Sequence, residues 1–310
     1  MGVTGGEVTV NQLTWQVGSL REVVDGHDFL KDHGVDVVRI GRDMPGGNWH
    51  VYFRDPDGHQ NELYYGMEQV GWQRSSRPMA MYDRGFKERP SLPQMSEAAE
   101  IEDAIAKGID INSGYSPRET LDRRFDVGGV LLPRPFKVTR IGPVAIFVED
   151  VERSADFYTR LLGFCFTEES LVEGERCIYL RAGTEHHALA LLPRSLRAKL
   201  GLSSHSTLAT FGLEVGSYRQ LREAVAFLKN KGWQFLEQLP ASLFPGIDYA
   251  AFVLDPAGHC LMLYYYMEQI GWDGHPRPPA ERRVVDPKWP CSIPPLSDTY
   301  VDQTFPGPLG

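Results

Sequence analysis

Two stretches of this chain repeat each other, and they differ at a position where chemistry would be expected. Residues 10–72 and 208–272 align almost without gaps, and both carry an Asp-Pro-x-Gly-His turn and a Met-Glu-Gln-x-Gly-Trp segment. Seven residues after the turn aspartate, the first copy has Glu62 and the second has Met262. A carboxylate can hold a divalent cation, whereas a thioether is a poor ligand for hard cations. The two copies are therefore expected to differ in their ability to hold a metal.

The elements that must position these side chains follow one order. In the first copy, the β-rich stretch Val8–Val17 precedes an amphipathic helix over Ser19–His33, which Gly34 ends. Three short strands are predicted next, over residues 35–40, 50–54 and 60–65. The resulting βαβββ pattern occurs three times, as unit A (about 7–66), a more divergent unit B (about 137–193) and unit C (about 207–266).

This pattern predicts an α+β fold and four segments along the chain. Residues 1–72 hold the single unit A, and residues 137–272 hold units B and C as a pair. Residues 73–136 form a proline-containing linker with one helix, predicted from Ser96 to Gly108. Residues 273–310 form a proline-rich tail that should run extended.

Composition limits the partners. A net charge of -9 argues against nucleic-acid binding, which needs clustered Lys and Arg, and the longest apolar stretches fall short of a membrane span. Four cysteines without a CxxC spacing favour a reducing compartment. We therefore expect a cytoplasmic protein whose partner is a small molecule.

The three βαβββ units, the Asp-Pro-x-Gly turn and the strand Ile141-Gly-Pro-Val-Ala-Ile-Phe-Val-Glu-Asp resemble the vicinal oxygen chelate superfamily. That superfamily includes glyoxalase I, bleomycin-resistance proteins and type I extradiol catechol dioxygenases, of which the two-domain dioxygenases are most similar in layout. The resemblance implies that paired units close into a cup-shaped, eight-stranded mixed sheet, with a divalent metal held at its bottom by two His and one Glu.

The resemblance also implies one proton-transferring residue. The stretch His186-His187-Ala-Leu-Ala-Leu is similar to the His-His-x-x-Ala-Leu strand of extradiol dioxygenases, whose second His is an active-site acid or base. By that match His187 is the candidate catalytic residue. An imidazole has a near-neutral ordinary pKa and suits this role.

The expected metal ligands are replaced in units B and C. The three family positions fall on Pro143, Thr210 and Met262. Because these side chains cannot supply a set of hard ligands, we predict no metal there and doubt ring cleavage. The alternative is a displaced metal site built from some of His187, His205, His259 and Glu214. Without a metal, the cup would still be a mostly apolar pocket suited to an aromatic ligand. Its predicted substrate-binding residues are Pro143, Phe147, Thr210, Phe211, Met262 and Tyr264, with His205 at the mouth.

Unit A offers a second candidate site. Gln12 aligns with the first-strand ligand position and Glu62 with the last-strand position, a pairing that glyoxalase I uses in its metal set. The resemblance thus implies that Fe, Mn, Zn or Ni could bind there, although a second unit must complete the site. The chain reads as if the first unit of an N-terminal pair were absent, so a homodimer could complete the cup, or residues 73–136 could shield it. Alternatively, Glu62 is a hydrogen-bonded polar residue in a non-catalytic domain.

Three functions stay open. The first is an extradiol-dioxygenase-like enzyme of aromatic catabolism, favoured by the layout and His187. The second is a metal-independent enzyme or a binding protein similar to bleomycin-resistance proteins, favoured by Pro143, Thr210 and Met262. The third is a glyoxalase-like metal enzyme using Gln12 and Glu62 across subunits.

Overall fold

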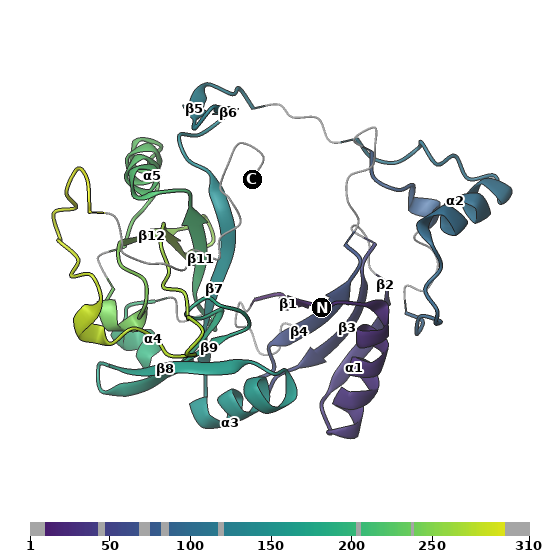
Figure 1. The fold of residues 1–310 in the computed structure, drawn as a ribbon, viewed down its shortest axis with the longest axis horizontal. Helices are drawn as coiled ribbons and strands as arrows, with labels where there is room; N and C mark the ends of the chain where they lie inside the picture. Colours follow the sequence, from purple (N-terminus) through teal and green to yellow (C-terminus); the bar gives the residue numbers. More distant parts are fainter. Residues whose placement is uncertain are drawn as a thin grey trace. The chain divides into compact units, whose positions relative to one another are not determined.

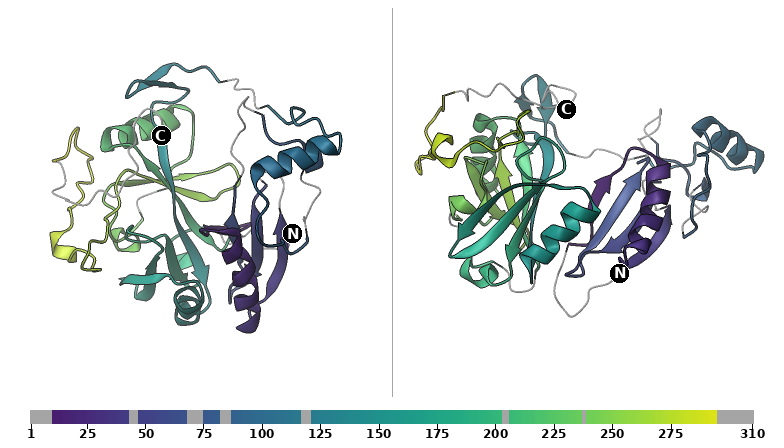
Figure 2. Two further views of the ribbon diagram at one scale, coloured as in Figure 1. Left: turned by 45° about the vertical axis from the view of Figure 1, so that its right-hand side comes forward. Right: turned by 60° about the horizontal axis from the view of Figure 1, so that its bottom comes forward.

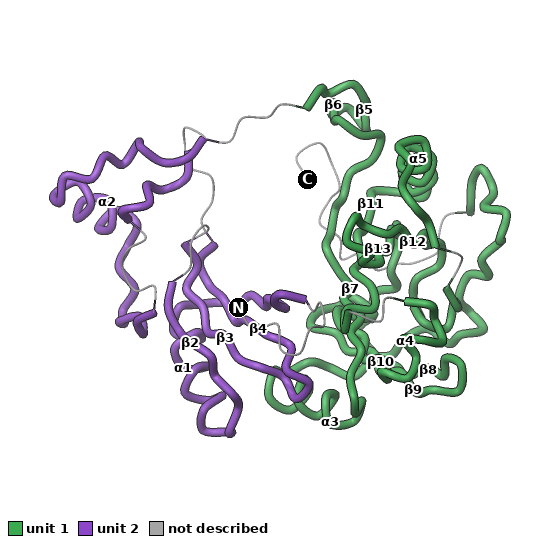
Figure 3. Tube along the Cα trace, turned by 180° about the vertical axis from the view of Figure 1, so that it is seen from behind, with its two compact units in different colours: residues 1–9, 121–310 green, residues 10–120 purple. Residues whose placement is uncertain are grey.

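The structure, a computed structural model, describes residues 10–42, 47–67, 75–81, 87–116, 121–202, 206–236 and 239–294. The chain forms two compact units, one of residues 10–120 and the other of residues 121 onward (Figure 3). Each unit has a β-sheet with a helix lying along it (Figures 1 and 2). The segment 73–136, expected to be a linker, is divided between the two units.

Unit A has the predicted βαβββ order. Its four-stranded sheet runs β1-β4-β3-β2, with β1 parallel to β4 and the other pairs antiparallel. The helix begins where the Ser19 side chain accepts a hydrogen bond from the Glu22 backbone, and it buries one apolar face. The elements are β1 (Leu13–Gln16), α1 (Leu20–Asp32), β2 (Val37–Arg42), β3 (Trp49–Arg54) and β4 (Gln60–Tyr65).

The helix predicted between Ser96 and Gly108 is α2 (Glu97–Ala106), which groups with residues 10–120. The Ser96 hydroxyl accepts a hydrogen bond from the Ala99 backbone, and Gly108 follows the last turn with φ +74°. Both ends therefore have the chemistry that the sequence indicated.

Units B and C lie in the second unit and share one sheet. Its seven strands run in the order β12-β13-β11-β7-β10-β9-β8 and include both parallel and antiparallel pairs. Unit B contains β7 (Val138–Val148), α3 (Val151–Asp156) continued by a π-helical turn (Phe157–Leu161), β8 (Cys165–Val172), β9 (Glu175–Arg181) and β10 (Leu189–Pro193). Unit C contains β11 (Leu208–Val215), α5 (Tyr218–Asn230), β12 (Ala250–Leu254) and β13 (Cys260–Tyr264). Shorter elements are β5 (Phe125–Val127), β6 (Val130–Leu132), α4 (Leu196–Lys199) and the 3-10 turns η1 (Met79–Met81), η3 (Ala241–Leu243) and η4 (Pro279–Glu281).

The paired units and the mixed sheet confirm the predicted fold, but the described residues form seven strands of the sheet rather than the predicted eight. Where unit C should supply its second strand, a single bridge joins Phe235 to Val253. Residues 239–247, which we call the plug, carry Pro240 and Pro245 and form the turn η3 instead. Proline cannot donate to a strand ladder, so this segment leaves the sheet.

The plug packs on the inner face of the sheet, which we define as the face opposite α5. Plug side chains Leu243 and Phe244 join a buried cluster with Phe147 and Met262, and Phe244 stacks on Phe252 at 5.4 Å. On the other face, α5 packs against residues of β11, β12 and β13. Among the described helices, none is long and apolar enough to cross a membrane.

Candidate functional site

The structure places the three replaced ligand positions on the neighbouring strands β7, β11 and β13. Thr210 pairs with Ala145 of the inner cluster, and Met262 pairs with Gly212. Gly212 approaches β7 so closely that an added Cβ would lie 2.6 Å from Pro143 Cδ. The three positions thus lie on adjacent strands of one sheet.

The donor chemistry at these positions does not fit iron(II) or manganese(II). Pro143 has no side-chain donor atom, Met262 offers a soft sulfur, and Thr210 offers one neutral hydroxyl. Across the residues that the structure describes, no three or more His, Cys, Asp or Glu side chains gather where they could hold a metal.

The residues considered for a displaced metal site are dispersed. His259 lies in the turn after β12, where its Nδ1 is 3.1 Å from the Asp255 carboxylate. Glu214 lies 3.7 Å from Arg140, and burial raises its pKa although Arg140 opposes the shift. His205 lies outside the described residues.

His187 is buried inside unit B. Its ring packs edge-on against Tyr179, with centroids 5.1 Å apart, and its Nδ1 is 3.0 Å from His186 Nδ1. Burial lowers the pKa of His187 well below its ordinary value, and the charges of His186 and Arg282 lower it further. The imidazole is therefore neutral at physiological pH.

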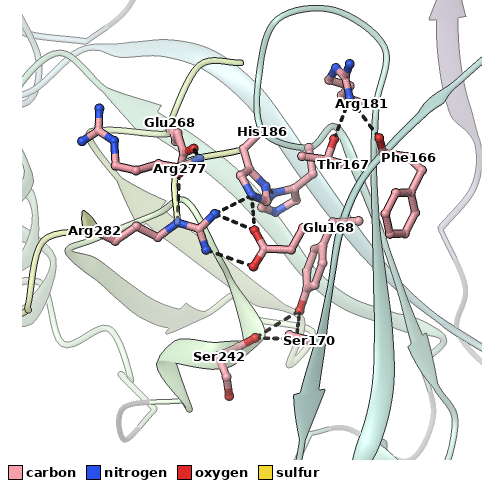
Figure 4. Close-up of polar contacts among 12 residues, drawn as sticks. Phe166, Thr167, Glu168, Ser170, Arg181, His186, Ser242, Glu268, Arg277 and Arg282 are labelled. Atoms are coloured by element: carbon pink, nitrogen blue, oxygen red, sulfur yellow. Dashed lines mark hydrogen bonds and ion pairs between the residues drawn. The ribbon is translucent and has the colours of Figure 1, made fainter. Parts of the chain in front are cut away.

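A charged network adjoins this histidine pair (Figure 4). His186 Nε2 lies 2.9 Å from Glu168 Oε2, and Arg282 donates to both Glu168 oxygens at 3.0 and 2.5 Å. Arg282 Nε also donates to Glu268 at 3.0 Å. Burial raises the pKa of Glu168, but the hydrogen bonds from His186 and Arg282 outweigh it and lower the pKa to about 2. Arg282, in the tail of residues 273–310, thereby forms ion pairs with units B and C.

The tautomer of His187 follows from that of His186. His186 Nε2 lies beside the Glu168 carboxylate, which accepts hydrogen bonds, and 3.2 Å from Arg282 Nη2, which donates them. When Nε2 carries the only proton of the His186 ring and donates to Glu168, His186 Nδ1 accepts from His187 Nδ1. In that arrangement the remaining nitrogen, His187 Nε2, carries a lone pair.

Two buried polar atoms on the inner side of units B and C lack a partner among the described residues. They are His187 Nε2 and Thr210 Oγ1, and both residues are 1% exposed or less. An unsatisfied buried polar group costs about 1–3 kcal/mol, so a ligand that pairs with these atoms would recover that cost. These atoms mark the candidate site.

The predicted lining residues are covered in this structure. Phe147, Met262 and Tyr264 are all 1% exposed or less, and the inner cluster that contains them includes plug residues. Tyr264 also donates a hydrogen bond of 2.7 Å to the Gly142 carbonyl. The cup is therefore closed at these residues.

Phe211 is not brought to the inner face. It pairs with Leu261, which packs in the α5-facing cluster, whereas its neighbours Thr210 and Gly212 pair with the inner residues Ala145 and Met262. Successive strand residues point to opposite faces, so Thr210 and Phe211 cannot both line the cup.

In unit A the structure brings Gln12 and Glu62 together. Gln12 Nε2 donates to Glu62 Oε2 at 2.6 Å, and Thr14 donates to the same oxygen at 3.1 Å. Asn48 Nδ2 donates to the other oxygen at 2.7 Å. Gln12 and Glu62 alone are fewer than the three protein ligands of a usual catalytic metal site.

Sequence reasoning missed Glu168, Arg282 and Asn48. Glu168 and Arg282 lie 114 positions apart, and no local spacing connects them. Asn48 had a weak signal, because it directly precedes a strand that pairs with the strand of Glu62.

The comparisons with known proteins agree with this fold. Residues 140–263 match the family model described as Glyoxalase/Bleomycin resistance protein/Dioxygenase superfamily. No curated protein matches the chain in sequence. Among solved structures, the chain is similar to a 2,2',3-trihydroxybiphenyl 1,2-dioxygenase from Sphingomonas wittichii strain RW1, with 18% identity, 86% of this chain and 74% of that chain covered, and a TM-score of 0.52.

Two further structures have the same likeness. The 2,3-dioxygenase LapB from Pseudomonas sp. KL28 has 16% identity, covers 85% of this chain and 74% of its own, and gives a TM-score of 0.52. A Mn(II)-bound glyoxalase from Novosphingobium aromaticivorans has 15% identity, covers 95% of this chain and 78% of its own, and gives a TM-score of 0.50. At these identities the likeness concerns the fold. Residues 140–263 thus match the model of the Glyoxalase/Bleomycin resistance protein/Dioxygenase superfamily, and the chain is similar in fold to these dioxygenases and this glyoxalase.

Proposed function

We propose that the cup of units B and C binds a small aromatic ligand carrying a hydroxyl group, without a metal. The observation that carries this proposal is the buried, unpartnered Nε2 of His187 beside the ring of Tyr179. In the tautomer that leaves this nitrogen a lone pair, a phenolic O–H would donate to it, and the Thr210 hydroxyl would offer a second polar contact. Aromatic and apolar side chains of the inner cluster would surround the ring.

The same histidine favours binding over proton abstraction. Its pKa is lowered well below the ordinary value by burial, so the imidazolium that a general base must become is disfavoured. Ring cleavage further requires a metal with open positions, which Pro143, Thr210 and Met262 do not provide. A bleomycin-resistance-like binding role therefore fits these residues better than catechol oxidation.

Ligand entry would require the plug to move. The plug is held by hydrogen bonds from Tyr179 to the Leu243 carbonyl at 3.0 Å and from the Glu268 backbone to the Gly246 carbonyl at 2.7 Å. Gly246 has φ +80° and touches His186, so this segment and the histidine pair would shift together.

Calorimetric titration with phenol and with its methyl ether, anisole, tests the proposal. We expect wild type to bind phenol more tightly than anisole, because only phenol can donate to His187 Nε2. The apolar replacement His187→Phe should weaken phenol binding about three- to tenfold and leave anisole binding nearly unchanged. Equal affinities for the two ligands in wild type, or iron(II)-dependent consumption of catechol, would contradict a metal-free phenol site.

A second candidate function rests on the 2.6 Å contact between Gln12 and Glu62. A glyoxalase-like metal site there would need further ligands, which a second copy of the chain would supply in a homodimer. Elemental analysis tests it. Stoichiometric Fe, Mn, Zn or Ni in wild type, lost in Glu62→Ala but retained in the control Glu214→Ala, would support this candidate. A metal-free monomer by light scattering would remove it, and loss in Glu214→Ala alone would point to a displaced site.

A further inference from the structure

A cavity of about 380 Å³ lies within the unit of residues 10–120, and the metal candidates Gln12 and Glu62 do not line it. It is bounded by the start of α1, the ends of β2 and β3, and residues 80–109. Its size falls within the range of small-ligand sites. The apolar part of its wall includes Leu20, Trp49, Met81, Pro90, Met95 and Ile109.

The cavity wall includes one buried cation, Arg42, whose side chain is 10% exposed. The guanidinium lies over the Trp49 ring at 5.1 Å, donates from Nε to the Gly47 carbonyl at 2.8 Å, and donates from Nη1 to Glu100 at 3.4 Å. No acceptor in the described part of the chain meets Nη2. A guanidinium has five N–H donors in a fork that matches a carboxylate, so Arg42 keeps unused capacity.

The charged neighbours of Arg42 are largely paired. Glu100 is shared, because Arg77 Nη1 also bonds its carboxylate, and Arg77 Nη2 lies 3.5 Å from Glu97. Among the other charged residues of the wall, Asp103 is paired with Lys107 at 3.0 Å, and Arg89 is paired with an aspartate outside the cavity. Arg42 therefore keeps donor atoms available beside the cavity.

We propose that this cavity binds a small monocarboxylate with an apolar, planar body. The carboxylate accepts hydrogen bonds from the unused donors of Arg42. The body lies against Trp49 and the Met81 and Met95 side chains, which adapt to flat ligands. This inference does not depend on the function proposed for the cup.

Benzoate tests the site, and benzamide is its neutral control of nearly the same shape. In calorimetric titration of the full chain, we expect one benzoate site per chain and affinity at least about tenfold higher than for benzamide. Arg42→Met should abolish that preference. Arg89→Gln, which removes an arginine of the same wall whose guanidinium is already paired, should retain it.

A second variant tests the same site in case Arg42→Met does not fold. Ala104 lies in α2 and lines the cavity, so Ala104→Leu should fill part of it and weaken benzoate binding while Arg42 stays in place. His187→Phe should leave benzoate binding unchanged, which separates this site from the cup. No benzoate binding at millimolar concentration, equal binding of benzamide, or undiminished binding by a folded Arg42→Met or by Ala104→Leu would overturn the proposal.

Discussion

Replacing Arg282 by Met should lower the free energy of unfolding by about 3–5 kcal/mol, because removing one partner leaves the other charges of a buried network uncompensated. Arg282 donates to Glu168 and Glu268, and all three side chains are less than one-fifth exposed. Methionine keeps the apolar stem of the side chain, so the loss reports on charge and hydrogen bonding rather than on packing. Urea unfolding at neutral pH measures it.

This effect should depend on pH with a defined sign. The pKa of Glu168 is lowered from 4.5 to about 2 in the folded state, so its contribution is present above pH 4.5 and is lost as the pH falls toward 2. The difference between wild type and Arg282→Met should therefore shrink on acidification.

Two controls make the Arg282 prediction specific. Arg160→Met breaks an exposed pair with Asp156 and should change stability by less than about 1 kcal/mol. The double variant Glu168→Gln/Arg282→Met should be less destabilised than the sum of its single variants, because both remove the same interaction. Additive effects, or a loss for Arg282→Met as small as that of Arg160→Met, would contradict the role given to the network.

The change Met262→Glu should also destabilise the protein strongly, by several kcal/mol at neutral pH. It puts back the carboxylate that Glu62 provides in the other repeat, but Met262 is 0% exposed inside the apolar inner cluster. Burying an ionised carboxylate without a paired cation is far more costly than burying its neutral form. The neutral control Met262→Gln should lose less free energy of unfolding, and Met262→Leu should lose little of it.

The pH dependence of Met262→Glu should have the opposite sign to that of Glu168. Burial should raise the pKa of the introduced carboxyl above its unfolded value of about 4.3, so the destabilisation is absent below that pH and grows as the pH rises through it. Thermal unfolding followed by circular dichroism at acidic and alkaline pH measures this difference. If the loss of stability did not depend on pH and equalled that of Met262→Gln, the prediction would be contradicted, because the introduced glutamate would then be exposed to water.

The two histidines of the family triad extend this experiment. In the triple variant Pro143→His/Thr210→His/Met262→Glu, added manganese(II) should recover part of the lost stability, since binding to the native state alone stabilises it. Met262→Glu alone should gain much less from the same metal. Equal responses would mean that the three positions do not converge on one ion.

Much of unit B could be predicted from sequence because its helices and strands end at residues that strongly prefer one backbone conformation. The strand Val138–Val148 begins at the predicted start of unit B, and Gly163 ends the following helical segment with φ +74°. Glycine adopts this left-handed conformation without a steric penalty, so its position in the sequence predicts where the helical segment ends.

The βαβββ pattern predicts a second strand in unit C, which the described residues do not form. Pro240 and Pro245 have no backbone N–H to donate to a strand pair. Burial of Leu243 and Phe244 on the inner face then stabilises the plug in place of a strand pair. Tertiary packing thus determines the structure of this segment, which the alignment of the repeats alone could not predict.

The candidate site was only partly predictable, for two physical reasons. His187 was found through the His-His motif, which is local in sequence, whereas its network depends on Arg282 in the tail. The prediction that Phe211 lines the cup together with Thr210 is wrong, because successive strand residues point to opposite faces. Irregular pairing between β7 and β11 on both sides of these residues makes their faces hard to infer without the register.

The plug makes the cup a conformational equilibrium rather than a fixed receptor. With Leu243 and Phe244 buried in the inner cluster, a ligand of this cup would bind only the minor population in which they have moved. Its apparent affinity would equal its intrinsic affinity multiplied by the open fraction, so each 1.4 kcal/mol favouring closure lowers it about tenfold. The sequence of the plug would therefore set the ligand concentration to which the protein responds, without any plug residue contacting the bound ligand.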